Sequence, residues 1–157
     1  MNKINRVLSH PLFLTLSRVL IGLVFLVSSL DKLTHPVEGF MASVRGYHLL
    51  PELFLRPFSL ILPWIELFTG AFMIFGLFYR FSTAMAGGLL LLLTAVIGAT
   101  LLRGIPLDDC GCFKSFGIKE SGPVALTRNF ILLLVWLNLF RLPDPGWSAD
   151  RFFQDHP

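Results

Sequence analysis

The chain has 157 residues, of which 54% are hydrophobic and 15% are charged, and its formal net charge is +3. Soluble domains average about 45–50% apolar and about 25% charged residues, so this composition excludes an ordinary soluble fold. The basic residues form no run and do not alternate with aromatic residues, which argues against a nucleic-acid partner.

Four apolar segments are long enough to cross a bilayer, because about 20 helical residues span a hydrocarbon core of about 30 Å. The predicted spans cover residues 12–30, 58–78, 82–102 and 123–140. The sequence therefore predicts an all-α integral membrane four-helix bundle. We expect residues 1–157 to form a single transmembrane domain that ends in a polar tail at 141–157.

The first span follows a positively charged start, as a signal peptide does. Its apolar run is longer than the usual h-region and is interrupted by Arg18, so we interpret it as an uncleaved helix. Residues 36–48 follow, with apolar side chains at helical spacing. They predict a short amphipathic helix that lies either in the membrane interface or as a lid on the end of the bundle.

The second and third spans are joined by a tight turn, predicted at Tyr79-Arg80-Phe81. Four spans place both termini on one side and the polar segments 31–57 and 103–122 on the other. Lys and Arg are nearly balanced between the sides, so the positive-inside rule does not choose an orientation. Disulfide chemistry requires an oxidising compartment. We therefore predict a bacterial-type inner membrane, with cytoplasmic termini and a periplasmic or extracytoplasmic cysteine loop.

The loop at 103–122 contains both cysteines of the chain, in the order Asp109-Cys110-Gly111-Cys112. Cα atoms of residues i and i+2 can come within bridging range, and Gly111 gives the backbone the freedom to turn tightly. Closing so small a ring restrains the unfolded chain by about 1.6 kcal/mol, which makes a poor structural staple. Strained and exposed bridges are the labile, catalytic ones, so the pair favours redox chemistry.

The charges around the cysteines are mixed. Asp108 and Asp109 disfavour a thiolate, whereas the basic residues of the loop favour one. A structural bridge and a metal site are the alternatives. Two thiolates with His35 and His48 offer zinc ligands at an unusual spacing, and two thiolates alone suit Cu(I). We rank metal binding below redox chemistry and assign no metal ligands.

Three spans carry ionisable residues, which are costly in a bilayer and usually face a partner inside the bundle. Glu66 is placed to pair with Arg128 or Arg18. Lys32, at the end of the first span, either anchors at the interface or reaches toward the thiols or Glu66. A structural ion pair and a proton or substrate site beneath the cysteines both fit this pattern.

Together these residues resemble the DoxX-like superfamily, and within it most closely the MauE (methylamine utilisation protein) branch. The matches extend from about residue 12 to 140 and comprise Arg18, Asp31-Lys32, Pro36, Pro63-Trp64-Ile65-Glu66-Leu67, Gly70, Asp109-Cys110-Gly111-Cys112-Phe113 and Arg128-Asn129. The resemblance implies a small helical membrane protein that acts in extracytoplasmic redox work. It also implies a thioredoxin-like partner and, from other DoxX-like proteins, a link to quinone.

The sequence thus predicts a membrane thiol–disulfide oxidoreductase component in which Cys110 and Cys112 carry the exchange. The supporting residues are Gly111, Asp109, Lys32, Glu66, Arg128 and Arg18. The expected partners are the lipid bilayer and a thioredoxin-like or disulfide-containing protein, with quinone as a candidate cofactor. The alternatives are a non-catalytic accessory subunit of a larger membrane complex and a metal-binding or transport module.

Overall fold

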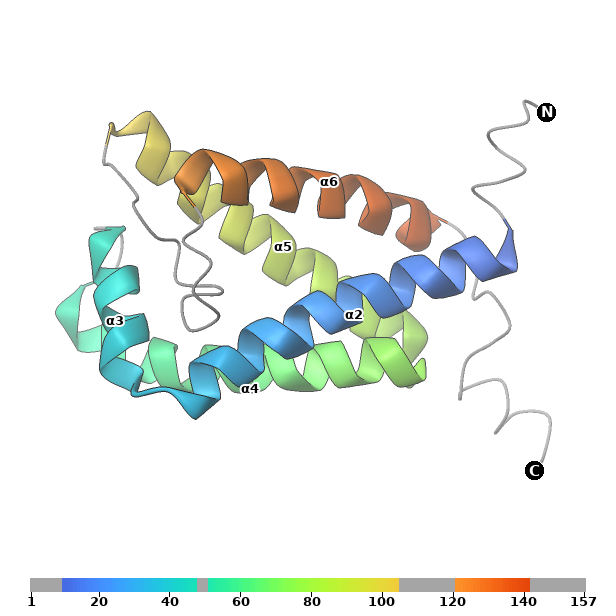
Figure 1. Cartoon of the computed structure of the whole chain (residues 1–157), viewed down its shortest axis with the longest axis horizontal. Helices are drawn as coiled ribbons and strands as arrows, with labels where there is room; N and C mark the ends of the chain where they lie inside the picture. Colours follow the sequence, from blue (N-terminus) through green and yellow to red (C-terminus); the bar gives the residue numbers. More distant parts are fainter. Residues whose placement is uncertain (1–9, 48–50, 105–120, 142–157) are drawn as a thin grey trace.

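The computed structural model describes residues 10–47, 51–104 and 121–141, which fold into five helices (Figure 1). The long helices are α2 (Pro11–Thr34), α4 (Glu52–Phe75), α5 (Tyr79–Leu102) and α6 (Gly122–Arg141), and the short helix α3 (Val37–Gly46) follows α2. Each long helix has the length and apolar composition of a membrane span. The prediction of an all-α fold with four spans and a short helix after the first is confirmed.

Helix α4 begins at Glu52, although the sequence predicted a span that starts at residue 58. The early start depends on tertiary packing. Leu55 is 1% exposed and packs in a cluster with Val44 and Tyr47 of α3 and its C-cap. Burial of such a side chain stabilises by about 1.5–3 kcal/mol, which offsets the charged and proline residues in the first turns of α4.

The turn between α4 and α5 consists of residues 76–78, so the turn predicted at Tyr79-Arg80-Phe81 is wrong. Gly76 has φ 68° and ends α4, and the Leu77 N–H donates to the Phe72 carbonyl oxygen at 3.0 Å. A left-handed glycine followed by such a bond is a common helix terminus. Tyr79 instead begins α5, and its hydroxyl donates to the Leu139 carbonyl oxygen at 3.1 Å.

The four long helices form two closely packed pairs, with α2 beside α4 and α5 beside α6 (Figure 1). The first pair meets at Gly22 and Gly70, where a Cβ added to Gly70 would lie 2.8 Å from the Gly22 carbonyl oxygen. In the second pair, Gly87 makes room for the Trp136 ring, whose Nε1–H donates to the Thr83 carbonyl oxygen at 2.7 Å. Small residues thus allow the helix backbones to approach closely, as membrane packing requires.

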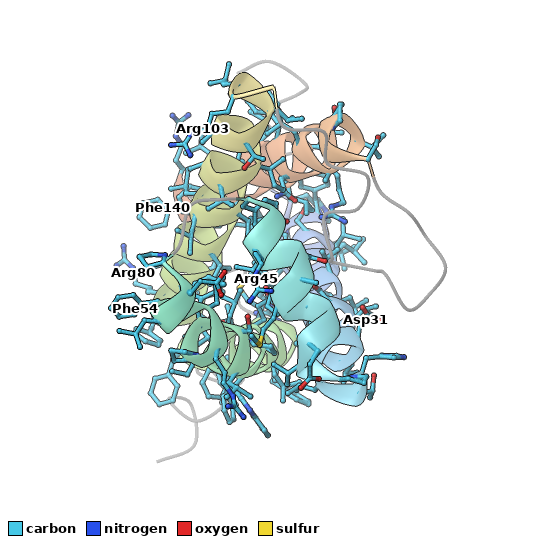
Figure 2. The ribbon with its side chains drawn as sticks, turned by 90° about the vertical axis from the view of Figure 1, so that its left-hand side faces the viewer. Asp31, Arg45, Phe54, Arg80, Arg103 and Phe140 are labelled. Carbon is cyan, nitrogen blue, oxygen red and sulfur yellow. The ribbon has the colours of Figure 1, made fainter. Side chains whose placement is uncertain are left out.

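The surface around these pairs is apolar. Figure 2 shows Phe54 and Phe140 at the outside of the bundle, and their side chains are 56% and 55% exposed. Such exposure is expected of residues that face hydrocarbon, because lipid tails are as apolar as the side chains themselves.

One end of the bundle carries α3, together with the end of α2, the start of α4, the end of α5 and the start of α6 (Figure 1). Gly104 lies just after α5 and Ser121 just before α6, so the cysteine loop leaves and rejoins the described structure at this same end of the bundle. Helix α3 packs there on α4. The predictions for residues 105–120, including the cysteines, and for the tail at 142–157 lie outside the described residues.

The contact at Gly70 makes a stability prediction with an internal control. We expect Gly70→Ala to lower the stability of the bundle by about 1–3 kcal/mol, because the new methyl group meets backbone atoms of α2 that cannot move aside. Gly88→Ala adds the same methyl group on α5 where nothing lies within 4 Å, and it should leave stability unchanged or slightly raised. Thermal unfolding in detergent micelles measures both; equal melting temperatures would contradict the close approach of α2 and α4.

Candidate functional site

A buried ion pair joins the two helices of the first pair. The Lys32 Nζ donates to both carboxylate oxygens of Glu66, at 2.7 Å to Oε1 and 2.6 Å to Oε2. The two side chains are 2% and 1% exposed. Both residues lie on the inward stripes of their helices, where buried positions recur every three or four residues, so the packing of α2 on α4 brings the charges together.

Helix α3 covers this pair with an aromatic ring. The Lys32 Nζ lies 4.9 Å from the centroid of the Phe40 ring, which is within the range of a cation–π interaction. Phe40 also packs against the central core and against the cluster that contains Val44. The ammonium group is therefore enclosed by the Glu66 carboxylate on α4 and the Phe40 ring on α3. The contact with Phe40 helps to position α3 on the bundle.

The structure pairs Glu66 with Lys32, whereas the sequence also allowed Arg18 or Arg128. Among the described residues, Lys32 is the cation in salt-bridge contact with Glu66. Arg18 lies 14 residues before Lys32 on α2, which is about 21 Å of helix at 1.5 Å per residue. The partner of Glu66 is determined by which helices are neighbours rather than by depth in the membrane. Because α2 packs on α4, Lys32 comes into contact with Glu66.

The two arginines occupy other places in the bundle. Arg18 is 3% exposed toward the opposite end of α2. Arg128 is half-buried on α6, and its Nη2 donates to the Asn129 Oδ1 at 3.3 Å. It also lines an open groove of about 470 Å³ together with Pro123, Val124, Thr127, Ile131 and Leu132.

The remaining predicted site residues, Asp109, Cys110, Gly111 and Cys112, lie outside the described residues. The described residues at either side of them, Gly104 and Ser121, belong to the end of the bundle that carries α3. Within the part of the chain that the structure describes, no three His, Cys, Asp or Glu side chains come together as metal ligands would.

Sequence reasoning missed Phe40 as a partner of Lys32. The signal was present in the apolar stripe of α3, which includes Phe40 and Val44, but that stripe does not say what the aromatic ring would face. Each carboxylate oxygen of Glu66 accepts a hydrogen bond from the Lys32 ammonium group, so the pair links α2 to α4 and acts as a lock between the two helices.

The lock predicts a strong loss of stability when one partner is removed. Lys32→Met or Glu66→Leu alone should cost about 3–5 kcal/mol, because each leaves the other charge buried without its counterion. The double variant should recover much of that loss, since it removes both charges together. Thermal unfolding in detergent gives the coupling between the two positions.

The exposed pair Arg45–Glu52 supplies the matched control. Its atoms are also 2.7 Å apart, but the side chains are 57% and 71% exposed. Glu52→Gln should therefore change stability by less than about 1 kcal/mol. Additive losses in the Lys32 and Glu66 double variant would contradict the lock.

Comparison of the chain with known proteins identifies its family. The family model described as methylamine utilisation protein MauE matches residues 10–142. The chain is similar to "Methylamine utilization protein MauE" of Paracoccus denitrificans, with 34% identity over 80% of this chain and 67% of the relative.

The protein of the same name from Methylorubrum extorquens is 34% identical over 92% of this chain and 77% of the relative. That of Paracoccus versutus is 31% identical over 92% and 79%. No solved structure matches the chain. The four apolar helices and these matches over nearly the whole length lead to one conclusion: the chain is a multi-pass membrane protein that belongs to the MauE family.

Proposed function

We propose that the chain is a thiol–disulfide exchange protein of the membrane in which Cys110 and Cys112 carry the reaction. The observation that supports this most directly is the position of the loop ends. Gly104 and Ser121 lead into the cysteine segment from the end of the bundle that the buried Lys32–Glu66 pair and α3 organise. A small ring of two cysteines and one glycine stabilises little as a staple, so redox exchange is its more effective use.

The reaction is an exchange of two electrons between dithiol and disulfide. One thiolate of the pair attacks a sulfur of the partner's disulfide, which forms a mixed disulfide and releases a partner thiolate. The second cysteine then attacks the mixed disulfide and releases the second partner thiolate. Cys110 and Cys112 are oxidised to a disulfide, the partner is reduced to a dithiol, and the same steps run in reverse when the partner is the reductant.

The bundle contributes a fixed platform for this exchange. The Lys32–Glu66 pair ties α2 to α4, and Phe40 ties α3 to both. Because Glu66 neutralises Lys32 locally, the pair adds little net field toward a thiolate. Assistance to the thiolate is therefore expected from the loop's own basic residues or from the docked partner, and the partner we propose is a thioredoxin-like or disulfide-containing protein.

The relatives carry a name that refers to methylamine utilisation. Under this proposal, an amine-oxidising system whose proteins contain disulfides is the first place in which to look for the partner. The cysteine loop would face the extracytoplasmic side, because disulfides persist in oxidising compartments.

Trapping with single-cysteine variants tests the exchange. Cys110→Ser or Cys112→Ser removes the resolving thiol in one of the two cases, so that variant should accumulate a mixed disulfide with a partner protein. The product is detected as a reductant-sensitive band on a non-reducing gel and identified by mass spectrometry. The variant with both substitutions is the control and should trap nothing.

The exchange proposal fails if neither single variant captures a protein and both leave the oxidation state of cellular disulfides unchanged, because the cysteines are then dispensable. Purification of a stoichiometric complex with such variants would then identify the chain as an accessory subunit.

Labelling in intact cells tests the orientation. A membrane-impermeant maleimide should label Cys112 in the Cys110→Ser variant without permeabilisation. Arg80→Cys in a background without other cysteines is the control, because Arg80 is exposed beside the α4–α5 turn, which lies at the end of the bundle away from α3 (Figure 1). It should be labelled only after permeabilisation, and the reverse pattern would place the cysteine loop in the cytoplasm.

A further inference from the structure

The two helix pairs of the bundle differ in charge. The acidic residues that the structure describes all lie on α2, α3 and α4, and they are Asp31, Glu38, Glu52 and Glu66. The described part of the α5–α6 pair holds no acidic residue but carries four arginines, which are Arg80, Arg103 just after α5, Arg128 and Arg141. Figure 2 shows Arg80 and Arg103 projecting to the outside of the bundle. The α5–α6 pair therefore presents positive charge to its surroundings.

Helix α6 carries a groove of about 470 Å³ on its outer face. The described residues that line it recur at intervals of three or four, so they form one face of the helix; they are Pro123, Val124, Thr127, Arg128, Ile131 and Leu132. Pro123 and Leu132 are nine residues apart, so the groove follows about 13.5 Å of α6. Helix α6 is also the least buried of the four spans, which leaves this face to the lipid.

The wall of the groove is apolar apart from Arg128. Val124 and Ile131 are exposed, and the buried Leu132 lies beneath them. The Thr127 hydroxyl donates to the Pro123 carbonyl oxygen at 2.9 Å, so it is satisfied within the helix. Arg128 is half-buried and donates to the Asn129 Oδ1, but a guanidinium has five N–H donors and can hold more than one partner at once. This cation therefore decides which charge the groove accepts.

Arg128 lies at a depth that a lipid phosphate can reach. It follows the first residue of α6 by six residues, which is about 9 Å of helix. Helix α6 begins at the end of the bundle that carries α3 (Figure 1). Long basic side chains near the end of a span extend toward the interface, and the bilayer thins locally around them. A headgroup phosphate and this guanidinium can therefore meet at the mouth of the groove.

We propose that the groove on α6 binds an anionic phospholipid. The phosphate of the lipid accepts charge-assisted hydrogen bonds from the Arg128 guanidinium. One acyl chain lies along the apolar wall formed by Val124, Ile131 and Leu132. This lipid site goes beyond the cysteine exchange and does not rest on it, because lipid binding alone decides its test.

The chemistry of the groove favours this occupant over other anions. Inorganic phosphate would contact Arg128 but would gain nothing from the apolar wall, whereas an acyl chain gains dispersion contacts along it. A zwitterionic phospholipid would bring its own cation to an end of the α5–α6 pair that also carries Arg103. An anionic headgroup meets attraction from both arginines, so the anionic class is preferred.

Native mass spectrometry of the full chain, purified in a mild detergent, tests the site. The probes are phosphatidylglycerol and phosphatidylcholine with identical acyl chains, and inorganic phosphate. We expect phosphatidylglycerol to bind about fivefold more tightly than phosphatidylcholine or better, which is the preference that one basic residue near a membrane surface supplies. Inorganic phosphate should not displace the bound lipid.

Matched variants locate the binding on α6. Arg128→Gln should remove the preference for phosphatidylglycerol, and Arg128→Lys should retain part of it, because the charge remains without the planar fork. Arg80→Gln is the control, since it removes one positive charge from the same helix pair at the other end and should leave binding unchanged.

A fourth variant tests the groove without altering its charge. Ile131→Trp fills the groove from a position that is 56% exposed, so it should weaken the binding of both lipids and leave the fold intact. Together with Arg128→Lys, it keeps the test decisive if Arg128→Gln does not fold.

Three results would overturn the lipid site. Equal binding of the two lipids would remove the role of the arginine, and equal losses in Arg80→Gln and Arg128→Gln would indicate a diffuse charge effect. Unchanged lipid binding in Ile131→Trp would show that no acyl chain lies in the groove. A copurified protein that both Arg128→Gln and Ile131→Trp release would identify this face as a protein interface instead.

Discussion

The Lys32–Glu66 ion pair is the interaction on which the rest of the structure depends. A lone ammonium or carboxylate at this depth would be costly in lipid, so each charge requires the other. Their distances of 2.6–2.7 Å require α2 and α4 to lie side by side in one register. Gly22 and Gly70 make that approach sterically possible, because any larger side chain would meet the opposite backbone. Electrostatics and small-residue packing thus specify the same helix pair, and each would be weaker alone.

The same interaction organises the end of the bundle where function is proposed. Phe40 rests on the Lys32 ammonium, so α3 is seated by the ion pair as well as by its contact with Leu55. Asp31, the residue before Lys32, is also buried at this end of α2.

Much of the fold follows from hydropathy, since four long apolar segments leave few arrangements other than spanning helices. The features that the sequence did not determine concern local backbone conformation and the choice of neighbouring helices. The turn at 76–78 depends on Gly76 adopting a left-handed conformation, and the aromatic residues after it gave no sign of that. The sequence offered Lys32, Arg18 and Arg128 as partners of Glu66, and the choice among them depends on which helices are neighbours, which a single sequence does not encode as a pattern. The burial of Asp31 had no signal either, because an acid at the end of an apolar run usually marks the water boundary. The cysteine pair, which was the clearest motif in the sequence, lies outside the described residues.

The short turn between α4 and α5 has a consequence for how the protein enters the membrane during synthesis. Residues 76–78 leave α4 and α5 too closely linked to insert independently, so the two should enter as a helical hairpin. That hairpin carries Glu66 into the bilayer. Lys32 precedes Glu66 by 34 residues in the chain, so it is already present on α2 when α4 is inserted. The order of translation thus delivers the counterion first, and the costly carboxylate can be neutralised as soon as it leaves the translocation channel.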